Sequence, residues 1–123
     1  MPWLILLLGG LGFLGFGIAY TLFPTRMGDF TDVGLSTSTA RADFMATYGG
    51  LQVGFGVFLL ACARAADWLE PGLWAATACL TGLASVRTLG IALGRARVRW
   101  SIWFGLALET VGAGLSAWGL SLA

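Results

Sequence analysis

Charged residues are scarce in this sequence, and two ionisable types are missing altogether. The 123 residues contain no Lys and no His, and charged residues make up 11% of the chain against 58% hydrophobic residues. A soluble domain carries about 25% charged residues, and a domain this small has too much surface to cover with so few. The composition therefore argues against a water-soluble monomer and against a disordered chain. It predicts an integral membrane protein.

These absences also remove several kinds of chemistry. Without His and Lys, the chain has no His-based metal site, no His general base and no Lys Schiff base. The two cysteines, Cys62 and Cys79, lack CxxC spacing, and their different depths in the predicted helices argue against a disulfide. A net charge of +1 provides no electrostatic basis for binding nucleic acid. We therefore expect no metal site, no cofactor and no nucleic-acid partner.

Four long apolar segments dominate what is present. The hydrocarbon core of a bilayer is about 30 Å thick and takes about 20 apolar residues to span. The segments predict helices over residues 3–23, 43–63, 73–93 and 100–122. The first lacks the basic start of a signal peptide, and Pro24 closes it. The sequence thus predicts an all-α fold: one transmembrane domain built as an up-down-up-down four-helix bundle.

The arginines are distributed unequally between the two ends of this bundle. The connections at 24–41 and 94–99 hold five arginines, whereas the connection after the second helix holds only Arg64. By the positive-inside rule, the first and third connections face the cytoplasm. We expect a bacterial inner-membrane protein with both termini in the periplasm. Five tryptophans near predicted helix ends fit an interfacial belt: Trp3, Trp68, Trp74, Trp100 and Trp103.

The chain holds 19 glycines, too many for turns alone. Helices in lipid associate where small residues let their backbones approach closely. We predict that three stripes of small residues are packing faces of the bundle and have no catalytic use. They comprise Ala42, Ala46, Gly50 and Gly54 on the second helix, Gly12, Gly15 and Ala19 on the first, and Gly105, Gly112 and Gly119 on the fourth.

Two charged residues fall inside the predicted spans, Arg87 in the third helix and Glu109 in the fourth. A charge at membrane depth costs about 2.5–3.5 kcal/mol on insertion scales and suggests a functional residue. At a rise of about 1.5 Å per residue, Arg87 lies roughly 10 Å and Glu109 roughly 14 Å from the third connection. Because the two helices are neighbours in the chain and antiparallel, we expect an Arg–carboxylate pair.

The second helix adds two polar residues near this level. Gln52 lies roughly 14 Å deep, and Tyr48 precedes it by one helical turn, so both project from one face. We predict that Arg87, Glu109, Gln52 and Tyr48 form a ligand-binding polar layer in the inner-leaflet half of the bundle. The competing interpretation, of equal weight, is that the layer only fixes helix register. No residue here activates a nucleophile, so no catalytic residue is assigned.

Four segments of the sequence resemble the DUF4345 family: PTRMG after the first helix, RADFMATYGGLQVGFGVFLL, RTLGIALG and WFGLALETVGAGLSAW. The resemblance covers nearly the whole chain and includes the positions of Arg87 and Glu109. Met45 departs from it, because the family often has Arg there. The resemblance implies a small bacterial four-helix membrane protein, and it implies no activity.

Two functions of different classes are consistent with these features. The first is binding of an amphipathic, lipid-like or quinone-like ligand, with its head at the polar layer and its tail along the helices. The second is that of an accessory or assembly subunit, packing against a larger membrane complex or a second copy through glycine-rich faces. A weaker third is a membrane isomerase-like enzyme with Glu109 as acid/base. Membrane lipids are expected partners in every case.

Overall fold

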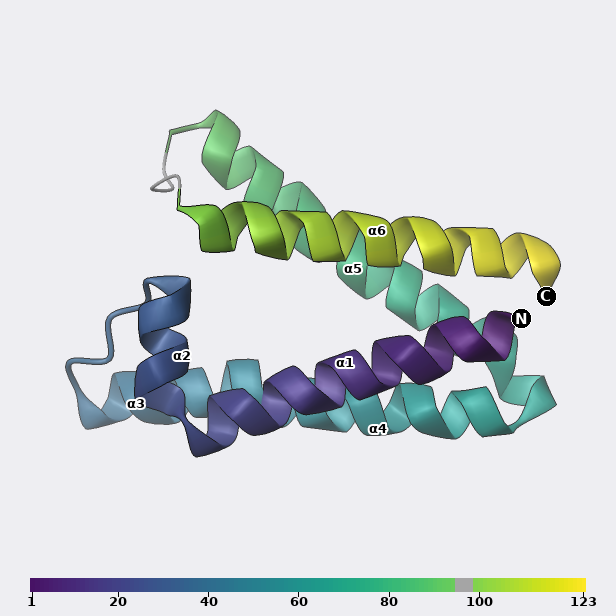
Figure 1. Cartoon of the computed structure of the whole chain (residues 1–123), viewed down its shortest axis with the longest axis horizontal. Helices are drawn as coiled ribbons and strands as arrows, with labels where there is room; N and C mark the ends of the chain where they lie inside the picture. The colour runs from purple at the N-terminus through teal and green to yellow at the C-terminus, as the bar shows by residue number, and fades with distance from the viewer. Residues whose placement is uncertain (95–98) are drawn as a thin grey trace.

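The computed structural model describes residues 1–94 and 99–123, and every regular element in these ranges is helical. The all-α fold is confirmed. Both termini and the connection after α4 lie at one end of the molecule, and consecutive long helices alternate in direction (Figure 1). The elements are α1 (Pro2–Leu22), α2 (Pro24–Thr31), α3 (Ser38–Phe44), η1 (Met45–Gly50), α4 (Leu51–Arg64), η2 (Ala66–Trp68), α5 (Leu69–Ala92) and α6 (Trp100–Leu122).

The second long helix is continuous from α3 through η1 into α4 and begins earlier than the predicted residue 43. Its N-cap is Thr37, whose hydroxyl oxygen accepts a hydrogen bond from the Ala40 amide at 3.0 Å. The segment η1 is a π-helical turn that ends at the Gly49–Gly50 pair. The third long helix also begins earlier than predicted, because Pro71 lies in its first turn, where a missing N–H leaves no helical bond unmade.

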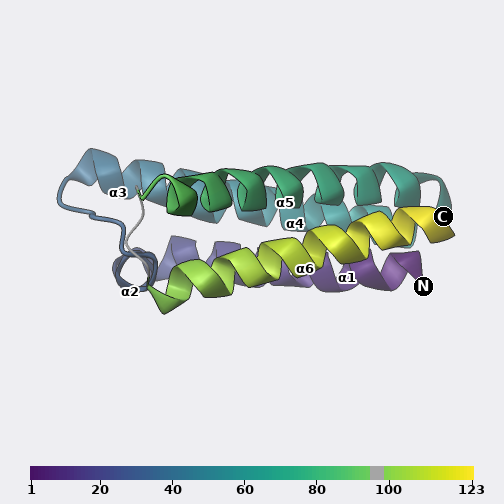
Figure 2. The same cartoon turned by 90° about the horizontal axis from the view of Figure 1, so that it is seen from above.

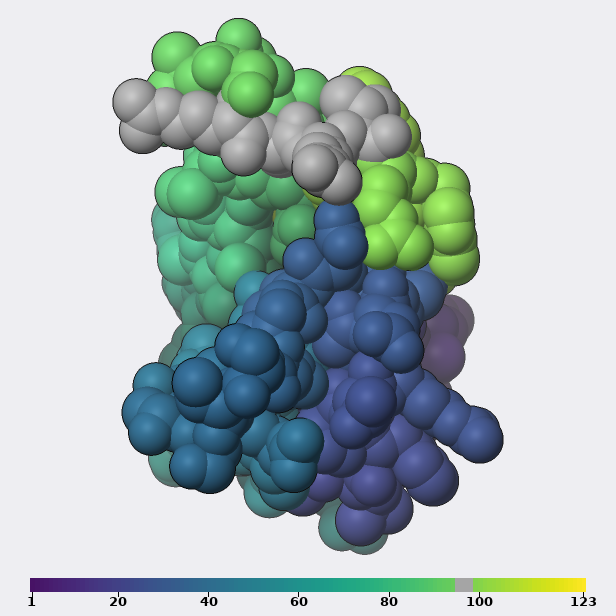
Figure 3. All heavy atoms as spheres, turned by 90° about the vertical axis from the view of Figure 1, so that its left-hand side faces the viewer, coloured from purple at the N-terminus to yellow at the C-terminus, as the bar shows by residue number. Residues whose placement is uncertain are grey.

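The predicted polar connection at 24–41 contains the short helix α2, which was not predicted from the sequence. It begins with Pro24 and ends at Thr31, and its C-cap residue Asp32 adopts the left-handed conformation with φ of 59°. In the view of Figure 2 this helix is seen end-on, so it runs across the axis of the long helices. Figure 3 shows the same end of the molecule, with the α2 region beside the start of α6. Phe30 of α2 packs edge-on against Trp100 of α6 with ring centroids 5.1 Å apart.

The four long helices pack as two antiparallel pairs, α1 with α4 and α5 with α6 (Figures 1 and 2). The two pairs meet toward the end that carries the termini, where the buried apolar core lies. They diverge toward the α2 end (Figure 1). The core consists of Leu6, Leu59, Cys62, Leu73 and Ala76.

Glycines set the close approach of α1 to the second long helix, but they are not the predicted ones. A Cβ atom at Gly17 would lie 2.9 Å from the Gly49 carbonyl oxygen, and one at Gly56 would lie 2.8 Å from the Gly10 carbonyl oxygen. Backbone contact this close is possible only without side chains at these positions. Glycines seven residues apart on each helix therefore form the interface between these helices.

The predicted packing stripe on the second helix is wrong within the chain, because α1 covers the Gly49–Gly56 face instead. The stripe residues are exposed, and open space surrounds the Cβ positions of its glycines and of Gly12 and Gly15 on α1. The exposed stripe comprises Ala42, Ala46, Gly50 and Gly54. The α6 stripe, in contrast, is confirmed. A Cβ at Gly112 would lie 2.8 Å from Leu80 of α5.

Three helices are long and apolar enough to cross a membrane: Pro2–Leu22, Ser38–Arg64 and Ala66–Ala92. They indicate an integral membrane protein. Helix α6 has 23 residues but is not among the three, because Glu109, three Trp and three Ser lower its hydropathy. Large apolar side chains on the long helices face outward, as lipid contact requires.

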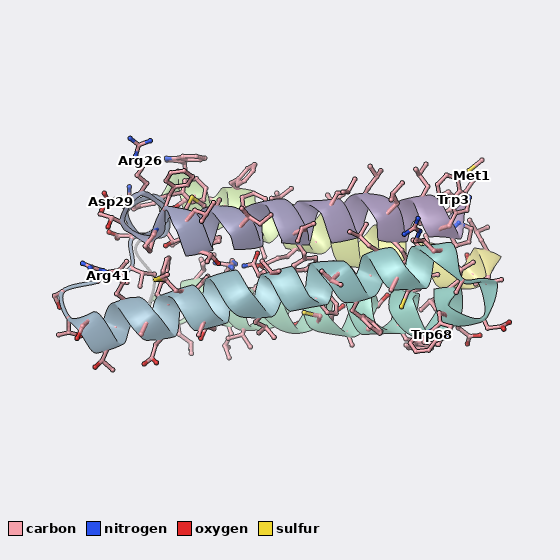
Figure 4. The ribbon with its side chains drawn as sticks, turned by 90° about the horizontal axis from the view of Figure 1, so that it is seen from below. Met1, Trp3, Arg26, Asp29, Arg41 and Trp68 are labelled. Carbon is pink, nitrogen blue, oxygen red and sulfur yellow. The ribbon has the colours of Figure 1, made fainter. Side chains whose placement is uncertain are left out.

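The two ends of the bundle differ in chemistry. Figure 4 shows Arg26, Asp29 and Arg41 together at one end of the molecule. Trp3 and Trp68 lie at the opposite end, where the N-terminal Met1 also lies. All five side chains are exposed. Charges thus gather at the end where the first connection lies, and two of the predicted belt tryptophans lie at the other.

Candidate functional site

Arg87 of α5 and Glu109 of α6 form the predicted charged pair. The Arg87 Nε donates a hydrogen bond to Glu109 Oε2 at 2.9 Å, and Nη2 donates to Oε1 at 2.6 Å. This two-point geometry is the strongest arrangement available to a guanidinium and a carboxylate. The pair joins two helices across 22 residues of sequence. It therefore fixes the register of α6 against α5.

Gly105 of α6 leaves room for the Arg87 side chain, which extends from α5. A Cβ atom at this glycine would lie 3.4 Å from Arg87 Cζ and 3.6 Å from Nε. Gly105 precedes Glu109 by four residues, so the two lie on one face of α6. The guanidinium thus rests against bare backbone beside the carboxylate. The sequence predicts Gly105 as a packing residue, and its four-residue spacing to Glu109 is the signal that indicates this second role.

The two charged side chains differ in exposure. Glu109 is 10% exposed, whereas Arg87 is 34% exposed. Each carboxylate oxygen accepts one hydrogen bond from Arg87, which occupies Nε and Nη2 of the guanidinium. The remaining nitrogen, Nη1, donates no hydrogen bond to any residue of the described chain. A guanidinium has donors on all three nitrogens, so Arg87 keeps hydrogen-bonding capacity that its partner does not use.

Three aromatic rings from α1 and the second long helix gather at the same end of the bundle. Phe44 and Tyr48 stack with ring centroids 4.8 Å apart, and Tyr20 lies 5.4 Å from each of them. Tyr20 and Phe44 are buried, and Tyr48 is half-buried. Tyr20, Phe44 and Tyr48 therefore form an aromatic cluster at this end of the bundle.

The aromatic cluster shares Tyr48 with the predicted polar layer, whereas Tyr20 and Phe44 lie outside that prediction. Phe44 precedes Tyr48 by four residues, a spacing that could have indicated their shared face. The π-helical turn over Met45–Gly50 contains Tyr48, and single π-helical turns are frequent at functional sites.

Gln52 is the predicted site residue that has no hydrogen bond, ion pair or ring contact to another side chain among the described residues. It lies in the first turn of α4, beyond the π-helical turn, and is half-buried. Its amide makes no hydrogen bond to another residue in the ranges 1–94 and 99–123. The turn between Tyr48 and Gln52 is not a regular α-helical one, so the four-residue spacing does not by itself put both on one face.

A second polar contact ties α2 to the start of α6. The Arg99 Nη1 lies 3.1 Å from Asp32 Oδ1 and donates a hydrogen bond to the Asp29 carbonyl oxygen at 3.3 Å. Both side chains of the ion pair are nearly half exposed. Arg95 and Arg97 of the predicted arginine cluster lie outside the described residues. Arg99 is the member of this cluster for which the structure defines a contact.

Other chemistry at the site is limited. Among the described residues, no three of His, Cys, Asp and Glu gather as metal ligands would. Cys62 and Cys79 are free thiols. Each Glu109 oxygen accepts one hydrogen bond from Arg87. What the arrangement offers is hydrogen-bond donation and flat aromatic surface beside an internally neutralised pair of charges.

Comparison with known proteins places the chain in a family. No curated protein and no solved structure matches it. The profile of DUF4345, described as a domain of unknown function, matches residues 3–120. That range includes both members of the charged pair and the whole aromatic cluster. The chain therefore belongs to the DUF4345 family.

Proposed function

We propose that this protein is a four-span bacterial inner-membrane protein that binds an amphipathic, lipid-like ligand, with the ligand's polar head at Arg87, Glu109, Tyr48 and Gln52. The observation that carries the proposal is the state of Arg87. Its charge is neutralised by Glu109, yet a third of its side chain is exposed and its Nη1 donors are unused within the described chain. Nη1 is not one of the buried side-chain atoms without a partner in the described chain, so this donor is accessible to a ligand.

Three features of α6 support its assignment as the fourth membrane span: its length, the neutralisation of its one charge, and its packing on α5. Its 23 residues reach about 35 Å at about 1.5 Å per residue, enough for a bilayer core of about 30 Å. Its one charged residue, Glu109, is neutralised by Arg87, which reduces the cost of placing a carboxylate at membrane depth. Glycines along α6 pack against α5, itself within the candidate span Ala66–Ala92.

The proposed orientation follows from the charges at the helix ends. Arg26, Arg41 and Arg99 belong to the first and third connections, and the positive-inside rule assigns this end to the cytoplasm. Both termini then face the periplasm. The Arg87–Glu109 pair lies in the half of the bundle nearer the cytoplasmic end, so a ligand of the inner leaflet would reach it with its head group.

The two other functions have different support. The exposed stripe over residues 42–54 would suit an accessory subunit that contacts a larger complex or a second copy, and this is the second candidate. An isomerase-like enzyme has less support, because the carboxylate of Glu109 is already engaged through both oxygens. We therefore infer a binding protein rather than an enzyme.

Native mass spectrometry from a mild detergent tests the proposal. The wild-type protein should retain a small amphipathic molecule, and the Arg87→Leu/Glu109→Leu double variant should lose it. The chain offers a matched control in Arg64 and Glu70, one Arg and one Glu that are exposed near the opposite end. The Arg64→Gln/Glu70→Gln variant should retain the molecule. A stoichiometric protein in place of a small molecule would favour the accessory subunit, and equal retention in all three proteins would refute the site.

A further inference from the structure

We infer that the head group is a neutral, flat hydrogen-bond acceptor, such as the carbonyl-bearing ring of a quinone, and not an anionic phosphate. This inference rests on the proposed function and names the ligand class of the same site. It follows from three properties of the polar layer: its net charge, the kind of hydrogen-bonding groups it leaves unused, and the shape of the surfaces beside them.

The net charge of the layer is zero. Arg87 carries the positive charge and Glu109 the negative one, and their atoms lie 2.6 and 2.9 Å apart at the two contacts. Tyr20, Tyr48 and Gln52 add no formal charge. An anionic head group would meet a guanidinium whose charge is already compensated by a carboxylate. It would bring a buried charge without a counter-charge, which is strongly unfavourable in a low-dielectric medium. A neutral head group carries no such penalty.

The charged pair leaves a hydrogen-bond donor of Arg87 unused within the described chain. Arg87 Nη1 can only donate, and the tyrosine hydroxyls can donate as well. Both Glu109 oxygens already accept hydrogen bonds from Arg87. A ligand that presents carbonyl or ether oxygens would complement this set, whereas a ligand that presents only N–H groups would not. Complementarity therefore favours an acceptor head group.

The surfaces at the layer are flat. Phe44 and Tyr48 are stacked at 30°, and Tyr20 packs against both. Half-buried Tyr48 leaves part of its surface uncovered. The guanidinium of Arg87 is itself planar and lies against Gly105, where no side chain crowds it. Aromatic rings pack favourably against a planar conjugated ring, with an offset or edge-on geometry. These surfaces favour a ring over a branched phosphate head group.

Binding of two probes to the detergent-purified protein tests the inference. The probes are decylubiquinone, which has a neutral ring with carbonyl acceptors, and dioleoyl phosphatidic acid, which is anionic. Affinities can be measured by microscale thermophoresis. The wild-type protein should bind the quinone at least tenfold more tightly than the anionic lipid. Arg87→Leu/Glu109→Leu should weaken quinone binding at least tenfold, and Arg64→Gln/Glu70→Gln should leave it unchanged.

A single substitution adds a sharper prediction. Glu109→Gln keeps the shape of the side chain but leaves the Arg87 charge uncompensated, so the preference should shift at least tenfold toward the anionic lipid. If the wild-type protein prefers phosphatidic acid and loses it in the double variant, the inference is overturned but the proposed binding function stands. If neither probe depends on the charged pair, both are overturned. Should Glu109→Gln fail to fold, as judged by circular dichroism, the wild-type preference and the double variant still decide.

Discussion

Replacing Arg87 with Leu would leave the Glu109 carboxylate, which is only 10% exposed, without its partner. Breaking a buried ion pair by removing one member costs about 3–5 kcal/mol in soluble cores, because an uncompensated charge remains. Both carboxylate oxygens lose a hydrogen bond in this variant. We therefore expect Arg87→Leu to lower the free energy of unfolding by about 3–5 kcal/mol.

The reverse substitution should cost less. In Glu109→Leu the surviving charge is Arg87, which is 34% exposed and lies five residues before the end of α5 at Ala92. A long arginine side chain can extend toward the interface and keep its charged head hydrated. We expect a loss of about 1–3 kcal/mol, close to the cost of one hydrogen-bonding partner of a charged group. The inequality between the two single variants follows from the difference in burial.

The double variant separates a true pair from two independent residues. With both charges replaced by Leu, no uncompensated charge remains, so the double variant should be more stable than Arg87→Leu alone. The coupling free energy should therefore exceed the loss in Glu109→Leu alone and reach about 3 kcal/mol. Reversible unfolding in mixed detergent, followed by far-ultraviolet circular dichroism, measures all four proteins. Additive losses would refute the reasoning, because they would mean that the two side chains do not meet in the folded protein.

Three further predictions concern packing, orientation and the second ion pair. Gly56→Ala should lower the free energy of unfolding by about 1–3 kcal/mol, because its Cβ would lie 2.7 Å from a backbone amide of α1, whereas Gly50→Ala, with open space around it, should not. In a cysteine-free background, Ser36→Cys should resist an impermeant thiol reagent in intact cells and Ser121→Cys should react; the opposite pattern would invert the proposed orientation. Arg99→Ala should change stability by less than about 1 kcal/mol in the same unfolding assay, since its ion pair is exposed.

The sequence predicted most accurately what hydrophobicity and charge determine. The first and fourth helices match residues 3–23 and 100–122 to within about one residue, a difference within the usual uncertainty of helix ends. The pairing of Arg87 with Glu109 followed from matched depth on adjacent antiparallel helices, and the structure confirms it. Both predictions depend on lengths along a helix axis, which the sequence defines directly.

Rotation about the helix axis was harder to predict. A stripe of small residues shows that a helix has a face on which another backbone can approach, but the second helix has two such faces. One carries Gly50 and Gly54 and is exposed, and the other carries Gly49 and Gly56 and contacts α1. Spacing alone does not choose between them. The π-helical turn that ends at Gly50 rotates the residues before it about the helix axis relative to those of α4. The predicted alignment of Tyr48 with Gln52 assumed a regular α-helix, so it is affected by the same rotation.

The charged pair connects the stability of the bundle to the proposed binding site. In the proposed four-span arrangement, Arg87 offsets the cost of placing Glu109 at membrane depth and joins α6 to α5. Yet the carboxylate engages only Nε and Nη2, and Gly105 keeps the guanidinium free of a crowding side chain. A donor held in place by a structural ion pair is already oriented before a ligand arrives, so binding would lose little side-chain entropy. The same contact can therefore fix the register of two helices and present a hydrogen-bond donor, and the two interpretations of the polar layer need not exclude each other.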